Sequence, residues 1–294
     1  MKNKADQLKR IGLVTNSLKP SSRSLIHKAA GLIRKSGRAV LCDAKTAWLT
    51  GLKCPSHPDA ATLGQEVDLL LVFGGDGMML GVARQVAGAR TPIFGIKVGG
   101  LGFLTAVTSD EMGQALKQIW GGDFFYESHP LIAATGLAQG HPIAQHALND
   151  FVISRGTAPR LIELRVTVDN DLLTNYRCDG LIVSSPTGST AYSLAAGGAI
   201  VSPKAEVLTL TPICPHTLSN RSVIVPLDAS VEVKVLSEKV ETILTADGQV
   251  QIPLSVGDAV TIRRSRLSVR VLRLNGSSFF DTLRRKLNWS GSNV

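Results

Sequence analysis

The sequence lacks most of the features that mark metal, redox and membrane proteins. Its four cysteines include no C-x-x-C pair, so neither a zinc ribbon nor a dithiol redox motif is indicated. There is no run of about 18 apolar residues, the length that a membrane-spanning helix requires. The N-terminal residues MKNKADQLKR have no apolar core of a secretion signal. We therefore expect a cytoplasmic protein whose thiols are reduced and structural.

Aromatic side chains are scarce as well, at 5% of the sequence. Proteins that bind single-stranded nucleic acid combine such side chains with cations. The formal net charge is +9, yet the tightest basic groups, residues 263–266 and 284–286, contain no aromatic residue. A positive field also attracts a nucleotide polyphosphate. The alternative interpretation of the net charge is a basic surface without a specific ligand. We expect small-molecule substrates, with neither nucleic acid nor a membrane as a partner.

Several common catalytic motifs are also absent. The Walker loop, the G-x-G-x-x-G dinucleotide fingerprint and the H-E-x-x-H zinc motif do not occur. The G-x-S-x-G elbow of serine hydrolases does not occur either. We interpret the six histidines as structural or surface residues and expect no metal ligands from the chain itself. Hydrolase and metalloprotease chemistry are therefore not indicated.

The patterns that are present predict two kinds of structure in succession. Residues 1–125 alternate short apolar strands with helical stripes, and the apolar run at 69–73 is typical of a strand buried in a parallel sheet. In residues 126–276, apolar residues often recur at every second position, which predicts half-buried strands. Residues 279–287 predict a final amphipathic helix. We expect an α/β N-terminal domain with an open, mainly parallel sheet (1–125, completed by 277–294) and a β-rich C-terminal domain (126–276).

The segment LLLVFGGDGMML, at 69–80, contains the most informative pattern. An apolar strand leads directly into GGDG at 74–77, and a helix is predicted at 79–87. Glycines let the backbone approach a ligand closely, and the N–H groups at a helix N-terminus favour phosphate. The candidate phosphate-loop residues are Gly74, Gly75 and Gly77. An acid there repels phosphate unless it orients a hydroxyl or holds a metal; the alternative is a tight turn in which Asp76 caps the helix.

Two further segments are rich in small residues. GIKVGGLGFL, at 95–104, predicts a second loop in which glycine backbone either meets a ligand or adopts positive φ angles. In CDGLIVSSPTGSTAYSLAAGG, at 178–198, a short strand is followed by closely spaced hydroxyls and glycines. Small residues leave room for a flat ligand, and hydroxyls can bond ribose or base edges. This segment predicts a nucleotide pocket, and a loop without a ligand is the alternative.

Taken together, these segments resemble the NAD kinase family, and the match covers nearly the whole chain. The blocks occur in the family's order: GGDG at 74, LGFL at 101, Asn149 with Asp150, DGLIVSSPTGSTAY at 179, HTLSNRSVIVP at 216 and DGQ at 247. The resemblance implies transfer of the γ-phosphoryl group of ATP to the 2′-hydroxyl of the adenosine ribose of NAD, giving NADP and ADP. It also implies two domains that enclose the dinucleotide, a last helix that packs on the first domain, Mg²⁺ or another divalent cation with ATP, and a homodimer or homotetramer.

The resemblance also implies roles for individual residues. Asp76 would be the general base that faces the 2′-hydroxyl. The implied NAD-binding residues are Asp76, Gly77, Asn149, Asp150, Arg160, Arg177, Asp179, Thr190, Ala191, Tyr192, Ser193, Leu194, Ala195 and Gln249. Four residues depart from the family pattern: Met78 replaces Thr, Lys97 replaces Asn, Asp150 replaces Glu and Ala195 replaces Ser. We expect these departures to alter fine substrate preference and not the class of enzyme.

Two rival hypotheses share part of this pattern. A lipid kinase of the diacylglycerol or sphingosine type has a similar glycine–acid loop, but it requires an apolar groove for acyl chains. A sensor would bind NAD(P) without turnover. The segment rich in Ser and Thr argues against the first, and Asp76 argues against the second. The sequence leaves open the phosphoryl donor and the preference between NAD and NADH.

Overall fold

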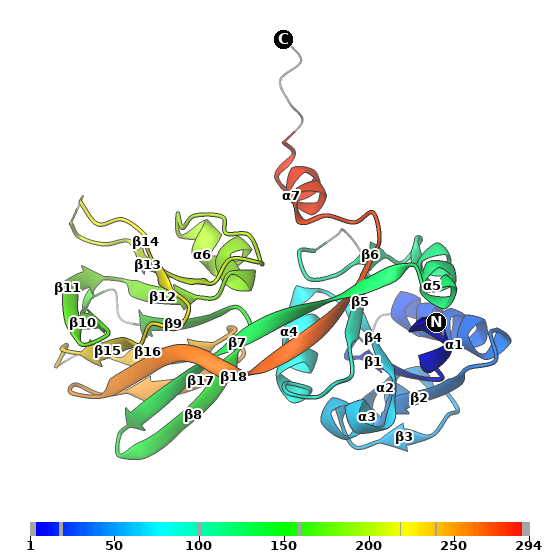
Figure 1. Cartoon of the computed structure of the whole chain (residues 1–294). Coiled ribbons are helices and arrows are strands. Elements are labelled where there is room, and N and C mark those ends of the chain that lie inside the picture. The colour runs from blue at the N-terminus through cyan, green and yellow to red at the C-terminus, as the bar shows by residue number, and fades with distance from the viewer. Residues whose placement is uncertain are drawn as a thin grey trace, which may run out of the picture. The chain divides into compact units, whose positions relative to one another are not determined.

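The computed structural model in Figure 1 describes residues 4–17, 20–98, 102–157, 160–217, 219–238 and 240–289. The chain divides into two compact units, Met1–Ser128 with Val269–Val294, and His129–Ser268. It passes from the first unit to the second within strand β7 (Phe124–Ala138) and returns within β18 (Ala259–Leu274). Across the described ranges, no helix is long and apolar enough to cross a membrane.

The first unit is built on a parallel sheet. Its strands lie in the order β18-β5-β4-β1-β2-β3, with β6 beside β5, and all of these pairs are parallel. Their bounds are β1 (Arg10–Thr15), β2 (Ala39–Asp43), β3 (Ser56–His57), β4 (Leu69–Gly74), β5 (Ile93–Lys97) and β6 (Val107–Thr108). Residues 69–73 of β4 are all fully buried. Because successive strand side chains point to opposite faces, both faces of the sheet are covered there, which confirms the predicted α/β unit.

Helices precede, connect and follow these strands. They are η1 (Lys4–Gln7), α1 (Pro20–Lys35), α2 (Ala44–Thr50), α3 (Ala60–Glu66), α4 (Asp76–Gln85), α5 (Met112–Gly121) and α7 (Phe279–Leu287). Helix α4 begins at Asp76 and not at Met79, because Gly75 already serves as its N-cap. The final helix, α7, occupies the predicted residues. The Nζ atom of Lys286 on α7 lies 5.9 Å from the ring centroid of Phe103 in the same unit.

The second unit contains two antiparallel sheets. One has the strand order β14-β13-β12-β9-β16-β17; in the other, β11-β10-β15-β18 follow one another and the β7–β8 hairpin pairs with β18. The remaining strands are β8 (His141–Ala147), β9 (Asp150–Arg155), β10 (Ile162–Val168), β11 (Asp171–Cys178), β12 (Gly180–Ser184), β13 (Val207–Ile213), β14 (Val223–Pro226), β15 (Val231–Val235), β16 (Thr242–Ala246) and β17 (Val250–Leu254). Two short helices, η2 (Thr187–Thr190) and α6 (Tyr192–Ala195), follow β12.

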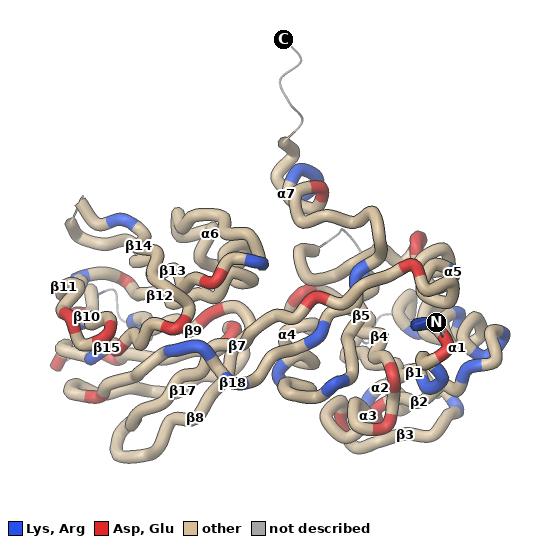
Figure 2. Tube along the Cα trace, viewed as in Figure 1, with Lys and Arg blue, Asp and Glu red and all other residues tan. Residues whose placement is uncertain are grey.

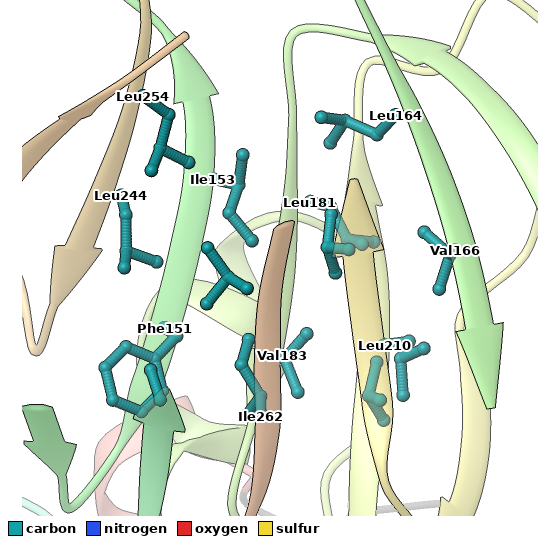
Figure 3. Packing of buried hydrophobic residues seen from close by; sticks show 14 of the residues in the cluster. Phe151, Ile153, Leu164, Val166, Leu181, Val183, Leu210, Leu244, Leu254 and Ile262 are labelled. Atoms are coloured by element: carbon teal, nitrogen blue, oxygen red, sulfur yellow. The ribbon is translucent and has the colours of Figure 1, made fainter. Parts of the chain in front are cut away.

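Apolar side chains from both sheets of the second unit form one core (Figure 3). Leu164 and Val166 of β10 belong to it, while Arg165 between them is exposed. Phe151 of β9 and Leu181 of β12 enter the same core from the other sheet. The alternation read from the sequence is therefore confirmed, and the unit has the arrangement of two packed sheets.

Charged residues are distributed over both units. Lys and Arg positions occur on many elements (Figure 2), as the dispersed basic residues of the sequence predicted. In the second unit, Arg263, Arg264 and Arg266 line an open groove of about 430 Å³ between β7, β8 and β18. No residue assigned to NAD or phosphate from the sequence lines this groove. The groove therefore does not coincide with the candidate site.

Candidate functional site

The GGDG segment forms the junction between β4 and α4. Strand β4 ends at Gly74, Gly75 is the N-cap, and α4 begins at Asp76. None of the three glycines has a positive φ, so they are not needed for a left-handed turn. Gly74 is needed for space, because a Cβ there would lie 2.8 Å from the Cβ of Met78; a Cβ on Gly75 would meet only the mobile end of Lys97, with Nζ at 2.8 Å. The junction therefore places backbone N–H groups at the carboxyl end of a parallel strand, where open α/β sheets bind ligands.

The carboxylate of Asp76 is held by the second glycine-rich segment. Its Oδ2 accepts a hydrogen bond from the N–H of Phe103 at 2.9 Å. Its Oδ1 accepts from the N–H groups of Leu104 at 3.3 Å and Thr105 at 3.4 Å. A Cβ on Gly102 would lie 2.0 Å from Oδ1 of Asp76, so only glycine fits there without a shift. We call residues 102–105 the Asp76 seat; the rest of the predicted glycine block, residues 99–101, lies outside the described residues.

The Asn149–Asp150 pair lies at the start of β9 in the second unit. Both residues are buried, at 7% and 4% exposure. The amide oxygen Oδ1 of Asn149 has no hydrogen-bond partner among the described residues. A buried acceptor without a partner is costly in a folded protein. This oxygen is therefore a candidate acceptor for an N–H or O–H group of a ligand.

Burial raises the pKa of the Asp150 carboxyl to about 7, and the negative charge of Asp247 adds to the rise. In an unfolded chain the pKa of an aspartate is about 3.9. Between these values the folded protein binds more protons than the unfolded chain, so the free energy of unfolding falls as the pH rises. Asp150→Asn, which resembles the protonated acid in shape, is expected to gain stability over the wild type, and to gain more at about pH 8 than at about pH 5. Urea denaturation at the two pH values measures this gain; a gain independent of pH would contradict the assignment.

Hydroxyls of the segment rich in Ser and Thr have a structural role. The hydroxyl of Ser184 donates to the carbonyl oxygen of Asn149 at 3.2 Å, and that of Ser185 donates to the carbonyl oxygen of Leu148 at 2.5 Å. Ser189 is buried and donates to the carbonyl oxygen of Pro186 at 2.8 Å. The hydroxyls of Ser184 and Ser185 therefore hold the backbone of residues 148 and 149, a role that the sequence did not indicate.

The predicted adenosine-pocket residues lie on η2 and α6, directly after these serines. Tyr192 is 48% exposed, and Thr190 is partly buried. Ser193 is buried, with its hydroxyl 3.1 Å from that of Thr211. The other members of this group are Ala191, Leu194 and Ala195, which are partly buried or exposed. This group follows Ser184 and Ser185 in the chain, and those two serines bond to the backbone of Asn149 and Leu148.

The remaining predicted contacts are more peripheral in the second unit. Arg177 is exposed and pairs with Glu163 at 3.0 Å. Asp179 accepts from Nε of Arg155 at 2.7 Å, a partner that the sequence did not single out. Arg160 is exposed, and Gln249 is exposed in the turn between β16 and β17. Across the described part of the chain, no three His, Cys, Asp or Glu side chains form a group suited to a metal ion.

Two sequence models of one family match this chain. The ATP-NAD kinase N-terminal domain matches residues 11–124, and the ATP-NAD kinase C-terminal domain matches residues 148–274. An NAD kinase of Desulforamulus reducens is 40% identical over 279 residues, which are 94% of this chain and 96% of that protein. An NAD kinase of Syntrophotalea carbinolica is 38% identical over 283 residues, which are 96% of this chain and 99% of that protein.

Solved structures share the fold. The crystal structure of yeast NADH kinase complexed with NADH has a TM-score of 0.86 and 25% identity, covering 97% of this chain and 89% of that one. An NAD kinase from Archaeoglobus fulgidus in complex with ATP has a TM-score of 0.76 and 24% identity, covering 96% of this chain and 100% of that one. At this identity the similarity is evidence for the fold alone. With both domain models matched and 40% identity over 94% of its length, this chain belongs to the NAD kinase family of phosphotransferases.

Proposed function

We propose that this chain transfers the γ-phosphoryl group of ATP to the 2′-hydroxyl of the adenosine ribose of NAD, forming NADP and ADP. Membership of the NAD kinase family supports the reaction. The observation that carries the mechanism is the placement of Asp76, the first residue of α4, with its carboxylate held by three backbone N–H groups. The acid in the phosphate loop thus has a fixed position and is not merely a helix cap.

Asp76 orients the hydroxyl and accepts its proton. A carboxylate has about four lone-pair directions, so three N–H contacts leave room for one hydrogen bond from a ribose hydroxyl. A carboxylate is much too weak a base to ionise such a hydroxyl in advance. The proton therefore moves late, as the loose transition state collapses onto the oxygen. Positioning of the nucleophile is then the larger part of the contribution of Asp76.

A divalent cation, Mg²⁺ in the first instance, would neutralise charge on the ATP oxygens. Mg²⁺ in such enzymes commonly keeps several water ligands and binds one or two carboxylates together with substrate phosphates. The N-terminus of α4 and Lys97, whose Nζ lies beside Gly75, are suited to bind the phosphates.

The second unit supplies the proposed NAD contacts. Asn149 offers an unpaired, buried acceptor, which suits a hydroxyl or amide N–H of the dinucleotide. The residues on η2 and α6, from Thr190 to Ala195, provide the small side chains and the exposed Tyr192 for the adenosine group. Arg160, Arg177, Asp179 and Gln249 complete the proposed set. We further propose a homo-oligomer in the cytoplasm, with light scattering of the purified protein as the test of assembly.

One assay tests the reaction. The purified protein is incubated with NAD or NADH and, in turn, ATP, another nucleoside triphosphate or polyphosphate, each with Mg²⁺, and NADP(H) is measured. NADP formation with at least one donor is expected. A parallel reaction with diacylglycerol as the acceptor distinguishes the lipid-kinase hypothesis. Binding of NAD without any NADP(H) under all conditions would favour the sensor hypothesis and contradict the proposal.

A further inference from the structure

The carboxylate of Asp247, in the second unit, has no role in the proposed reaction. Asp247 is buried, at 9% exposure, in the turn between β16 and β17. Its Oδ1 accepts from the N–H groups of Asn149 at 2.8 Å and Asp150 at 3.3 Å. Its Oδ2 accepts from the N–H of Leu148 at 3.1 Å. One side chain thus binds three consecutive backbone N–H groups, almost a hundred residues earlier in the chain.

The turn that contains Asp247 is itself fixed against β9. The backbone N–H of Asp247 donates to the carbonyl oxygen of Asp150 at 3.0 Å. Asp247 has a φ of +50°, a conformation that Asp and Asn adopt more readily than other residues with a side chain. Backbone and side chain of this residue therefore bind the same short segment, and the residue type suits the turn.

The opposite side of the segment is held by the residues that follow β12. The carbonyl oxygen of Asn149 accepts from the N–H of Ser185 at 2.8 Å and from the hydroxyl of Ser184 at 3.2 Å. A Cβ on Gly188 would lie 2.2 Å from that carbonyl oxygen, so the chain there approaches the segment as closely as glycine permits. The N–H groups of residues 148–150 and the carbonyl group of Asp150 thus bond to Asp247, while the carbonyl groups of Leu148 and Asn149 bond to Ser185 and Ser184, which leaves this backbone little freedom.

We propose that Asp247 is a positioning residue for dinucleotide binding, which fixes the backbone of residues 148–150 so that Asn149 and Asp150 present their side chains to NAD. This inference rests on the proposed function of the site. The unpaired, buried Oδ1 of Asn149 supports it, because such an acceptor is useful only if its position is set before the ligand arrives. Hydrogen bonds to a carboxylate are stronger than those to a neutral acceptor, which suits this task.

Asp247 also acts on Asp150 by its charge. Among the described residues, Asp247 is the charged group whose negative charge raises the pKa of Asp150, in addition to burial. Removal of this charge must lower that pKa. A residue that served only to stabilise the fold would change the stability of the protein but would not move the pH dependence of NAD binding. The two roles can therefore be separated by experiment.

The substitution Asp247→Asn is the sharpest test. Asparagine tolerates the positive φ, so the turn is preserved. Its amide presents one oxygen and one NH₂ group. In either orientation, the NH₂ group therefore faces a backbone N–H that now donates a hydrogen bond to Asp247, and that bond is lost. We expect the KM for NAD and the dissociation constant for NAD to rise at least about tenfold, with kcat and the KM for ATP changed by less than about threefold. The pH midpoint of kcat/KM for NAD is expected to move to lower pH.

The chain offers a matched control at another turn. Asp169 also has a φ of +50°, and its Oδ1 accepts from the N–H of Ser230 at 2.8 Å. It is exposed, and its hydrogen bond joins it to Ser230 and not to residues 148–150. Asp169→Asn removes the same charge from a similar turn. Its NAD affinity and its pH profile are expected to match those of the wild type.

The outcomes separate the two hypotheses. Wild-type protein that binds NAD but forms no NADP would contradict the proposed function and leave the positioning role standing, because isothermal titration with NAD still compares the variants. A folded Asp247→Asn protein with wild-type affinity for NAD and an unchanged pH midpoint would overturn the positioning role alone. If Asp247→Asn does not fold, Asp247→Glu replaces it. This variant keeps both oxygens but shifts them by one methylene, so an unchanged KM for NAD would again overturn the inference.

Discussion

Asp76→Asn is expected to bind NAD with an affinity within about threefold of the wild type and to form NADP at least about a hundredfold more slowly. The amide cannot accept the hydroxyl proton, and its NH₂ group is a donor where Asp76 now accepts from Phe103 or from Leu104 and Thr105. The nucleophile then loses both its base and part of its alignment. Turnover with saturating ATP and NAD, together with a separate NAD titration, measures the two effects independently.

A second carboxylate in the same unit provides the control for this experiment. Asp68 accepts from the N–H groups of Lys9 at 2.8 Å and Arg10 at 2.7 Å, and so it also fixes backbone through a carboxylate. Asp68→Asn is expected to lose stability but to keep its turnover number. Near-normal turnover by Asp76→Asn, or an equal loss of turnover in Asp68→Asn, would remove Asp76 from the role of general base.

The sequence predicted the elements around the site better than the contacts that make it work. The run at 69–73 is apolar at every position, and only a strand covered on both faces buries it, so β4 and the parallel sheet could be predicted. The GGDG motif at 74–77 then had to lie at the carboxyl end of that strand. These are local patterns, and they determine the secondary structure and the fold class.

The contacts of Asp76 and Asp247 could not be predicted in the same way. Asp76 bonds to Phe103, 27 residues away, and Asp247 bonds to Asn149, 98 residues away. Such partners depend on the order and register of strands, and no local pattern encodes them. The family resemblance pointed to DGQ at 247 but implied a contact with NAD only for its glutamine. In the structure, the aspartate of this motif binds the backbone of Asn149.

Ser184 and Ser185 show a different limit of sequence reasoning. A dense group of hydroxyls predicts hydrogen bonds, and a nucleotide was the expected partner. In the structure both hydroxyls donate to backbone carbonyl groups of residues 148 and 149. The partner of a buried hydroxyl is decided by which chain segment lies against it, and the pattern of residues does not show that segment. The two hydroxyls are therefore engaged with the chain itself, whereas Tyr192 of the same segment is 48% exposed.

Gly102→Ala is expected to lower kcat at least about tenfold without removing any catalytic group. The new Cβ would lie 2.0 Å from Oδ1 of Asp76, and 2.6 Å from both the carboxyl carbon and Oδ2 of the same residue. These distances are far below van der Waals contact, so the Asp76 carboxylate or the backbone of the seat must shift. Displacement of a positioned group by about 1 Å can slow a reaction about a hundredfold. The comparison of kcat with the KM for ATP and NAD then shows whether alignment or binding is lost.

Gly31→Ala controls for the effect of adding a methyl group to a glycine in the same unit. Gly31 lies inside α1, and a Cβ there meets nothing within 4 Å. Alanine is favoured over glycine in a helix by roughly 0.5–1 kcal/mol, so this variant is expected to be slightly more stable and equally active. A Gly102→Ala enzyme with wild-type kcat would mean that the backbone of the Asp76 seat moves and Asp76 does not. The position of the Asp76 carboxylate would then be set by other contacts. A loss of kcat with NAD binding retained would show that glycine is required at 102 because the general base occupies the space that a side chain would take.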